Sequence, residues 1–214
     1  MRVSKIECTM VSFIGQCFSS ITDCFYSTGE WSPHPRGHGF PLPPQPDVIL
    51  DSNAMGSEAV LVKNATRLCG TGGVRASAPI QQNKAYWEVK IQQSGIWSCG
   101  VGLRSCDLSQ TLGEDGKSWV INSENVIQHN RNVEYRLDQM KVQEGDVVGF
   151  SYDHVELNFY LNGVNLNTPL LGIKGTVYPV LYVDDGAILD AVFDSFRTEP
   201  PAGFDRIMVE KALL

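Results

Sequence analysis

Strict alternation of apolar and polar residues between Val155 and Leu161 constrains the fold more than any other feature of this sequence. In an extended strand, this alternation places apolar side chains on one face and polar side chains on the other, so one face is expected to meet a core and the other water. The following Asn162-Gly163 dipeptide suits a turn in which both central residues need positive φ, the strongest short-range hairpin signal. Asp153-His154 offers a tight link to the preceding run, residues 145–152. The segment is therefore predicted to build a sheet.

Two further segments follow the same plan of strand, turn and strand. Residues 84–91 alternate and continue through Ser94-Gly95 into residues 96–102, while residues 178–183 and 187–193 form a third pair, joined by an acidic turn. Several short strands at regular spacing predict an antiparallel sandwich or barrel. The residues expected in its core are Trp87, Trp97, Leu157, Phe159, Val180 and Val192.

The order of short motifs along these strands identifies a family resemblance. The motifs are Tyr86-Trp87-Glu88-Val89, Trp97 before Gly100-Val101-Gly102, Gly145-Asp146 with Phe159-Tyr160-Leu161-Asn162-Gly163, and Tyr178-Pro179-Val180 with its following Asp-Gly turn. In combination they resemble the SPRY (B30.2-like) family over residues 47–214. The resemblance implies an all-β fold, an antiparallel two-sheet β-sandwich of the concanavalin-like kind, and it agrees with the alternating strands.

The same resemblance implies non-catalytic recognition of a protein or peptide partner through loops at one end of the sandwich. No RING, B-box, coiled-coil or SOCS-box segment is readable, so we expect a stand-alone adaptor. Aromatic and arginine side chains dominate interface hot spots, and those in or beside predicted loops are the candidate contacts: Arg104, Trp119, His129, Asn130, Arg131, Tyr152 and Asp153. The alternative is a lectin-like sandwich that binds a small ligand or carbohydrate, although Arg104, Arg131 and Arg136 are too scattered to predict an anion pocket.

Charge and cysteine content narrow the class of partner and the compartment. The formal charge of −7 arises within residues 47–214, which hold 14 Lys and Arg against 21 Asp and Glu. Nucleic-acid binding is disfavoured because it needs a basic patch. The six cysteines include no CxxC pair, so neither a zinc site nor a disulfide framework is indicated. We expect an intracellular, cytoplasmic monomer with no cofactor and no metal.

Three polar clusters resemble ligand-binding or catalytic sites but have simpler structural interpretations. The Gly70–Gly73 run lacks the Gly-Lys-Ser/Thr ending of a phosphate loop and predicts a turn or bulge. Asp184-Asp185-Gly186 lacks the ligand spacing of a calcium loop and predicts a hairpin turn. His154 has no nucleophile elbow or oxyanion hole nearby, so no enzyme is predicted. Residues 122–136 are rich in polar side chains and are expected to contain an exposed loop.

The first 46 residues lie outside the resemblance. Within residues 1–31, apolar side chains from Met10 to Phe25 recur at helical spacing and predict an amphipathic helix that needs a surface, whether the domain, a partner or a membrane. Cys17 and Cys24 could be acylated, but the polar face carries no Lys or Arg to meet anionic lipid, which disfavours membrane contact. Residues 32–46 form a proline-rich linker whose PxxP spacings also match SH3-type ligands.

Overall fold

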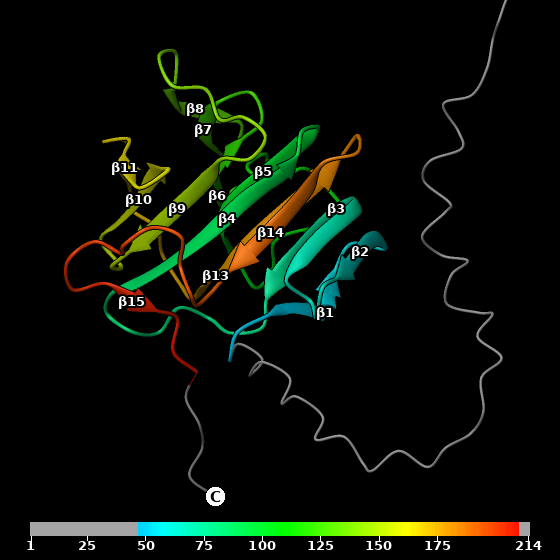
Figure 1. Ribbon diagram of the computed structural model, residues 1–214, viewed down its shortest axis with the longest axis horizontal. Helices are drawn as coiled ribbons and strands as arrows, with labels where there is room; N and C mark the ends of the chain where they lie inside the picture. The colour runs from blue at the N-terminus through cyan, green and yellow to red at the C-terminus, as the bar shows by residue number, and fades with distance from the viewer. Residues whose placement is uncertain (1–46, 210–214) are drawn as a thin grey trace, which may run out of the picture. The chain divides into compact units, whose positions relative to one another are not determined.

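Strands make up all the regular structure in residues 47–209, the part of the chain that the computed structural model describes (Figure 1). In chain order they are β1 (Leu50–Met55), β2 (Glu58–Val62), β3 (Arg67–Ala76), β4 (Ala85–Gln93), β5 (Ile96–Leu103), β6 (Ser118–Asn122), β7 (Val126–His129), β8 (Asn132–Arg136), β9 (Val147–Tyr152), β10 (Glu156–Leu161), β11 (Val164–Asn165), β12 (Leu170–Leu171), β13 (Val177–Asp184), β14 (Ile188–Val192) and β15 (Asp205–Arg206). The predicted helix and proline-rich linker of residues 1–46 lie outside the described residues.

The strands form one curled antiparallel sheet whose two halves face each other across the core, which confirms the predicted fold class. The hydrogen-bonded order is β11-β10-β9-β4-β14-β3-β13-β5-β6-β7-β8. We call the part from β11 to β14 the β9 half and the part from β13 to β8 the β5 half. Strand β3 belongs to both, because Leu68 pairs with β14 and Val74 pairs with β13.

The change of sheet within β3 explains the Gly70–Gly73 run. Gly70 and Gly72 have φ values of 84° and 131°, which residues other than glycine rarely adopt. A Cβ at Gly70 would lie 2.4 Å from the Glu58 carbonyl oxygen on the neighbouring β2. The run is therefore a bend inside a strand, where β3 leaves one half for the other, and bends of this kind are how strands switch sheets.

Two of the three predicted strand pairs are not hairpins. Strand β4 pairs with β9 and β14, whereas β5 pairs with β6 and β13, so the Ser94-Gly95 turn crosses between the halves. The Asp184–Gly186 turn crosses in the same way, because β13 pairs with β5 and β14 with β4. Gly95 lies so close to this second turn that a Cβ would be 2.5 Å from the Asp185 oxygen. The predicted β13–β14 hairpin is wrong, and the two crossings instead pack together.

The pair formed by β9 and β10 is a hairpin, as predicted, with Phe159 opposite Phe150. Asn162 and Gly163 both have positive φ, 49° and 84°, and they turn β10 into β11. Val155 departs from the prediction: it is 68% exposed and lies in the turn before β10. The expected loop at residues 122–136 is also different, because β6, β7 and β8 form two successive hairpins there.

Five of the six predicted core residues are buried. Trp87, Trp97, Leu157 and Phe159 share the main cluster between the halves, while Val180 is buried in a smaller cluster with Cys106, Leu112, Val120 and Tyr182. Val192 is only partly buried, because the inward positions of β14 are Leu189 and Ala191. Strand alternation was read correctly in β10, but its phase was misread in β14.

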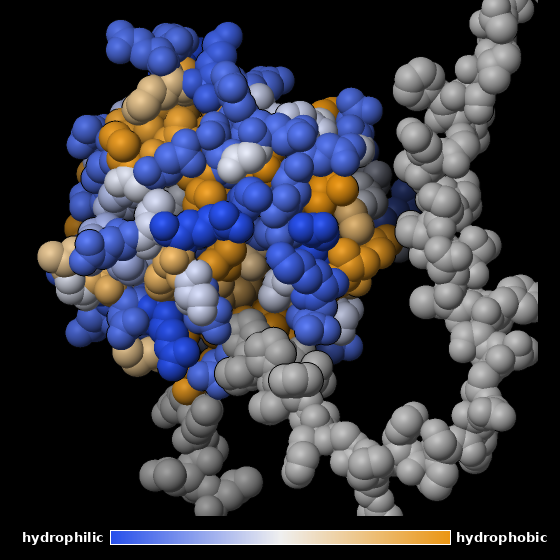
Figure 2. Space-filling model, viewed as in Figure 1, coloured by the Kyte–Doolittle hydropathy of each residue, from blue (hydrophilic) through white to orange (hydrophobic). Residues whose placement is uncertain are grey.

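The outer face of the β9 half is less open than the alternation predicts. The alternation in residues 84–91 predicts a polar face that holds Tyr86 and Glu88, yet both are fully buried, with Phe196 packed on Tyr86 and the amides of Arg197 and Thr198 bonded to Glu88. Figure 2 shows polar side chains over the middle of the face built from β4, β9 and β14, with hydrophobic side chains at two margins, near β10 and β11 and near β2 and β3. The exposed hydrophobic residues of these marginal strands include Val164 on β11, Leu171 on β12, and Val60 and Val62 on β2.

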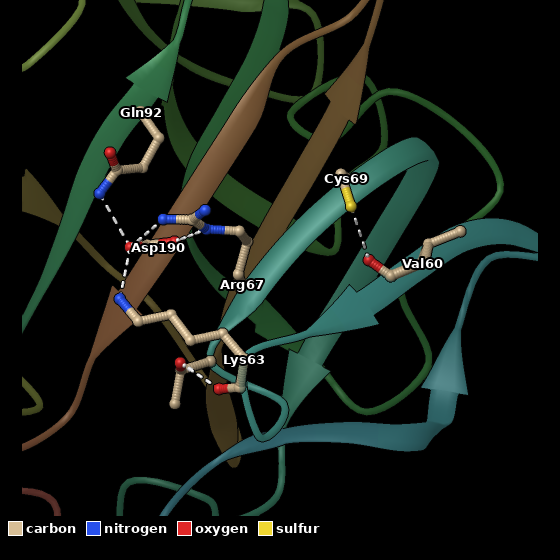
Figure 3. A network of polar contacts seen from close by, with 7 residues as sticks. Val60, Lys63, Arg67, Cys69, Gln92 and Asp190 are labelled. Carbon is tan, nitrogen blue, oxygen red and sulfur yellow. Dashed lines mark hydrogen bonds and ion pairs between the residues drawn. The ribbon is translucent and has the colours of Figure 1, made fainter. Parts of the chain in front are cut away.

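A buried carboxylate ties the start of β3 to the β9 half (Figure 3). Asp190 on β14 accepts hydrogen bonds from the Lys63 ammonium at 2.9 Å, from Arg67 Nε at 2.6 Å and from Gln92 Nε2 at 2.8 Å. Burial alone would raise the pKa of Asp190, but the hydrogen bonds from Arg67 and Lys63 outweigh it and hold the pKa below its ordinary value. The carboxylate is therefore charged and joins β14, β3, β4 and the turn after β2.

We expect Asp190→Ala to lower the free energy of unfolding by about 2 kcal/mol at pH 7, because it removes charge-assisted hydrogen bonds whose cations are partly hydrated. Lys63 is 60% exposed, so Lys63→Ala should cost less than about 1 kcal/mol. The lowered pKa means that the Asp190 contribution is complete above its unfolded pKa near 4 and is lost as the pH falls through the folded value. Urea unfolding at pH 7 and pH 3 measures this; an equal gap between wild type and Asp190→Ala at both pH values would contradict it.

Candidate functional site

A stacked aromatic pair forms the centre of the candidate site. Trp119 on β6 lies opposite His129 on β7, and their rings are 4.3 Å apart and nearly parallel, at 6°. His129 Nδ1 donates a hydrogen bond to the Ser118 carbonyl oxygen at 2.8 Å, since a carbonyl can only accept. This bond fixes the ring over Trp119, so the pair presents a rigid aromatic surface.

The aromatic pair lines a cavity of about 240 Å³ between β8 and the segment that contains β12. The other lining residues are Glu134, Tyr135, Pro169, Leu170 and Leu171. The Tyr135 hydroxyl donates a hydrogen bond to the Pro169 carbonyl oxygen and so ties the two walls together. We call these seven residues the Trp119 pocket.

One wall of the pocket is exposed to solvent. Leu171 is 64% exposed, whereas its neighbour Leu170 is buried. Consecutive side chains of a strand point to opposite faces, and here the face that carries Leu171 is open to solvent. An exposed leucine beside a stacked tryptophan is the kind of apolar surface that binds partners.

Two of the predicted contact residues form the tip of the hairpin next to this pocket. Asn130 and Arg131 have φ values of 52° and 63°, as a two-residue turn of the primed type requires. The Asn130 amide donates to the Asp115 oxygen, and the Arg131 amide donates to the Gly113 oxygen. The hairpin tip is thus held against the loop between β5 and β6, residues 104–117.

A second cavity, of about 280 Å³, lies where the tip meets this loop. Its lining residues are Asp107, Gln110, Thr111, Glu114, Asp115, Lys117 and Arg131. Arg131 lies 4.0 Å from Glu114, and both side chains are largely exposed. The charges here are mixed, with three carboxylates and two cations, so this cavity does not select one sign of charge.

The structure therefore brings together four of the seven predicted contact residues, namely Trp119, His129, Asn130 and Arg131. Arg104 is exposed in the β5–β6 loop but lines neither cavity; its carbonyl oxygen accepts a hydrogen bond from Arg75. Tyr152 is 1% exposed in the main core and is not available to a partner. Asp153 caps the β9–β10 turn by accepting from the amides of Val155 and Glu156.

Sequence reasoning missed the other five residues of the Trp119 pocket. Pro169-Leu170-Leu171-Gly172 carried a usable signal, because two adjacent leucines in an extended segment point to opposite faces, and one of them is exposed where only one face of the segment is covered. Glu134 and Tyr135 gave none, since residues 122–136 were predicted to contain an exposed loop. Their position depends on pairing with β7, which is invisible in a single sequence.

The groups that resembled a catalytic set are engaged elsewhere. His154 Nε2 lies 3.0 Å from the Gln82 carbonyl oxygen, and the Ser151 hydroxyl lies 3.2 Å from that of Tyr160. Burial raises the pKa of the Cys106 thiol to about 11 and raises that of Cys99 as well, which keeps both thiols protonated and unreactive. Residues 47–209 contain no group of three or more His, Cys, Asp or Glu side chains placed to hold a metal ion.

Within the part of the chain that is described, no helix is long and apolar enough to cross a membrane.

Comparison with known proteins identifies the family. The SPRY domain profile matches residues 84–195, and human SPRY domain-containing protein 7 is 51% identical over 179 residues, which cover 83% of this chain and 91% of the relative. The chain belongs to the SPRY domain family. A mouse SPRY relative, the probable E3 ubiquitin-protein ligase MID2, is 32% identical over 52% of this chain but only 17% of its own length.

The SPRY fold is also found among solved structures. The crystal structure of the TRIM65 PSpry domain matches 69% of this chain and 90% of its own chain, with a TM-score of 0.56 and 16% identity. This likeness supports the fold alone. SPRY domains are commonly protein-interaction modules and are generally non-catalytic, so membership places the chain in an interaction class.

Proposed function

We propose that this chain is a SPRY-domain adaptor that recognises a peptide or protein partner through the Trp119 pocket and the neighbouring hairpin tip. The observation that carries the proposal is the exposed apolar wall at Leu171 beside the rigid Trp119–His129 stack. Both features belong to strands that are hydrogen-bonded to their neighbours, which favours a preformed surface that loses little entropy when a partner binds. The family's common role as an interaction module supports the same conclusion.

The size of the cavity favours a peptide over a small molecule. At about 240 Å³ it falls below the roughly 300 Å³ at which small-molecule sites begin. A cavity of this size suits one side chain of an extended segment, with further contacts along the rim. The lectin-like alternative therefore gains no support from this pocket.

We place the adaptor in the cytoplasm. Cys69, Cys99 and Cys106 are free thiols, and free thiols are typical of proteins in a reducing compartment. The partner is accordingly expected in the same compartment.

We expect Leu171→Arg in the full-length chain to abolish capture of partners from a cytosolic extract, because an arginine at the rim fills the pocket opening. Val155→Arg is the matched control, since Val155 is 68% exposed in the β9–β10 turn and lies outside the pocket. Quantitative mass spectrometry of captured proteins should show a set that saturates with extract, persists in Val155→Arg and disappears in Leu171→Arg. Partners that persist in both variants, or that come only from a membrane fraction, would refute the proposed surface or compartment.

The tryptophan itself is unsuitable for this test. Trp119 is 8% exposed and packs in the main core, so its replacement by alanine would disturb folding and binding together. Leu171 separates the two effects.

A further inference from the structure

The chemistry of the Trp119 pocket specifies which side chain it receives, an inference that rests on the proposed function. Glu134 is the charged member of the seven lining residues. Its carboxylate is exposed and makes no hydrogen bond or ion pair within residues 47–209. The adjacent Val133 and Tyr135, by contrast, both pair with residues of β7. An unpaired carboxylate at the mouth of an aromatic pocket is available to a cation.

A β-bulge lies at Glu134, one of the residues that line the pocket. On β8, Val133 pairs with Gln128 and Tyr135 pairs with Ile127, so Glu134 is an extra residue without a partner on β7. In a regular strand, Glu134 and Tyr135 would point to opposite faces; the bulge interrupts this alternation at the point where both residues line the cavity. Bulges commonly re-aim a side chain beside a functional site.

The remaining walls suit the stem of a long side chain. Pro169 and Leu171 supply apolar surface, and the stacked Trp119 and His129 rings supply an aromatic one. Arginine carries an apolar stem and a flat cation that stacks on aromatic rings and pairs with a carboxylate through two hydrogen bonds. The net charge of −7 adds a long-range attraction for a basic segment.

We infer that the Trp119 pocket binds an arginine side chain of the partner, with the guanidinium on Glu134 and the stem against Leu171. The cations nearby do not compete for Glu134. Arg131 lies at Glu114 in the second cavity, and Arg136 lines a third cavity with Met140 and Thr168. Glu134 is thus the carboxylate that selects charge at this site.

The test selects peptides from a random displayed library on the immobilised full-length chain and keeps those that Leu171→Arg fails to bind. Each is then synthesised with arginine or with citrulline, which has the same shape without the charge. We expect the selected peptides to share an arginine, and citrulline or Glu134→Gln each to weaken binding roughly tenfold, as loss of a charge-assisted pair implies. In Glu134→Gln, citrulline should cause no further loss, because the two changes remove the same interaction.

Three results would overturn the inference. Peptides whose binding depends on Leu171 but that carry no arginine would leave the proposed function intact and refute arginine as the ligand of the pocket. If replacing arginine by citrulline weakens binding equally in wild type and in Glu134→Gln, the arginine of the peptide pairs with a carboxylate other than Glu134. A library that yields no peptide dependent on Leu171 would refute both the pocket and its ligand, while Glu124→Gln, an exposed glutamate outside the pocket, should leave binding unchanged throughout.

Discussion

Replacing Trp87 by alanine is expected to lower the free energy of unfolding by about 3 to 5 kcal/mol, the usual cost of removing a buried aromatic side chain. Trp87 on β4 is fully buried, and its ring stacks on Phe150 of β9 at 5.2 Å and 6°. Phe150 in turn meets the edge of Phe159 on β10 at 5.6 Å. The three rings hold three adjacent strands of the β9 half, so the cavity left by alanine cannot collapse without moving one of them.

The matched control is Trp87→Phe, which keeps an aromatic ring in the stack. The Trp87 indole N–H is buried without a hydrogen-bond partner in the described structure, so phenylalanine also removes an unsatisfied donor and offsets part of its lost volume. Its cost should be less than half that of alanine. Urea unfolding followed by far-UV circular dichroism compares the three proteins; an alanine variant as stable as wild type would show that the ring does not support the core.

The strands themselves could be predicted from sequence because their signals are local. Alternation in residues 157–161 places Leu157 and Phe159 inward, and Asn162-Gly163 supplies the positive φ that the following turn needs. These features depend only on residues a few positions apart. The same holds for Trp87, whose strand has the right period and phase.

The pairing of strands could not be predicted, because it depends on residues far apart in the sequence. Ser94-Gly95 and Asp184–Gly186 have the composition of hairpin turns, yet each carries the chain from one half of the sheet to the other. A tight turn allows either outcome. Strand β3 determines that these two turns cross between the halves, because its bend at Gly70 and Gly72 lets β13 and β14 pair with different parts of one strand.

The candidate site was predictable only in part for the same reason. Trp119, His129 and Arg131 could be selected by residue type, since aromatic and arginine side chains favour interfaces. Tyr152 fits the same rule but is buried, because it falls on the inward face of β9 opposite Leu157. Glu134 was missed because it lies at a bulge that is set by the pairing of β8 with β7.

Glu88→Ala is expected to destabilise the domain by about 3 to 5 kcal/mol, because several buried donors would lose their acceptor together. The Glu88 carboxylate is fully buried on the outer face of β4 and accepts hydrogen bonds from the backbone amides of Arg197 and Thr198, at 2.8 and 3.0 Å. The Thr198 hydroxyl also donates to it, and the Tyr86 hydroxyl lies 3.1 Å away. A chain segment more than 100 residues away in sequence is thus anchored to the sheet by one side chain.

Close packing around the Glu88 carboxylate leaves little room for a water molecule to take its place in Glu88→Ala. The Tyr86 ring meets the edge of Phe196 at 4.9 Å, and its hydroxyl occupies the space above Gly149, where a Cβ would lie 2.5 Å from it. Burial raises the pKa of Tyr86, so the hydroxyl stays neutral and can donate. Loss of Glu88 should therefore free the segment over Tyr86 as well as lower global stability.

Two measurements separate these effects. Thermal or urea unfolding gives the global loss, and limited trypsin digestion reports cleavage after Arg197, whose side chain is exposed while its amide is held by Glu88. Glu156→Ala is the control, because Glu156 lies on β10, beyond β9, and its carboxylate accepts one hydrogen bond, from Asn158. This change should cost less than about 1 kcal/mol and leave the cleavage rate unchanged. Faster cleavage at Arg197 with normal global stability would limit Glu88 to holding the segment, whereas no change in either would contradict the anchor altogether.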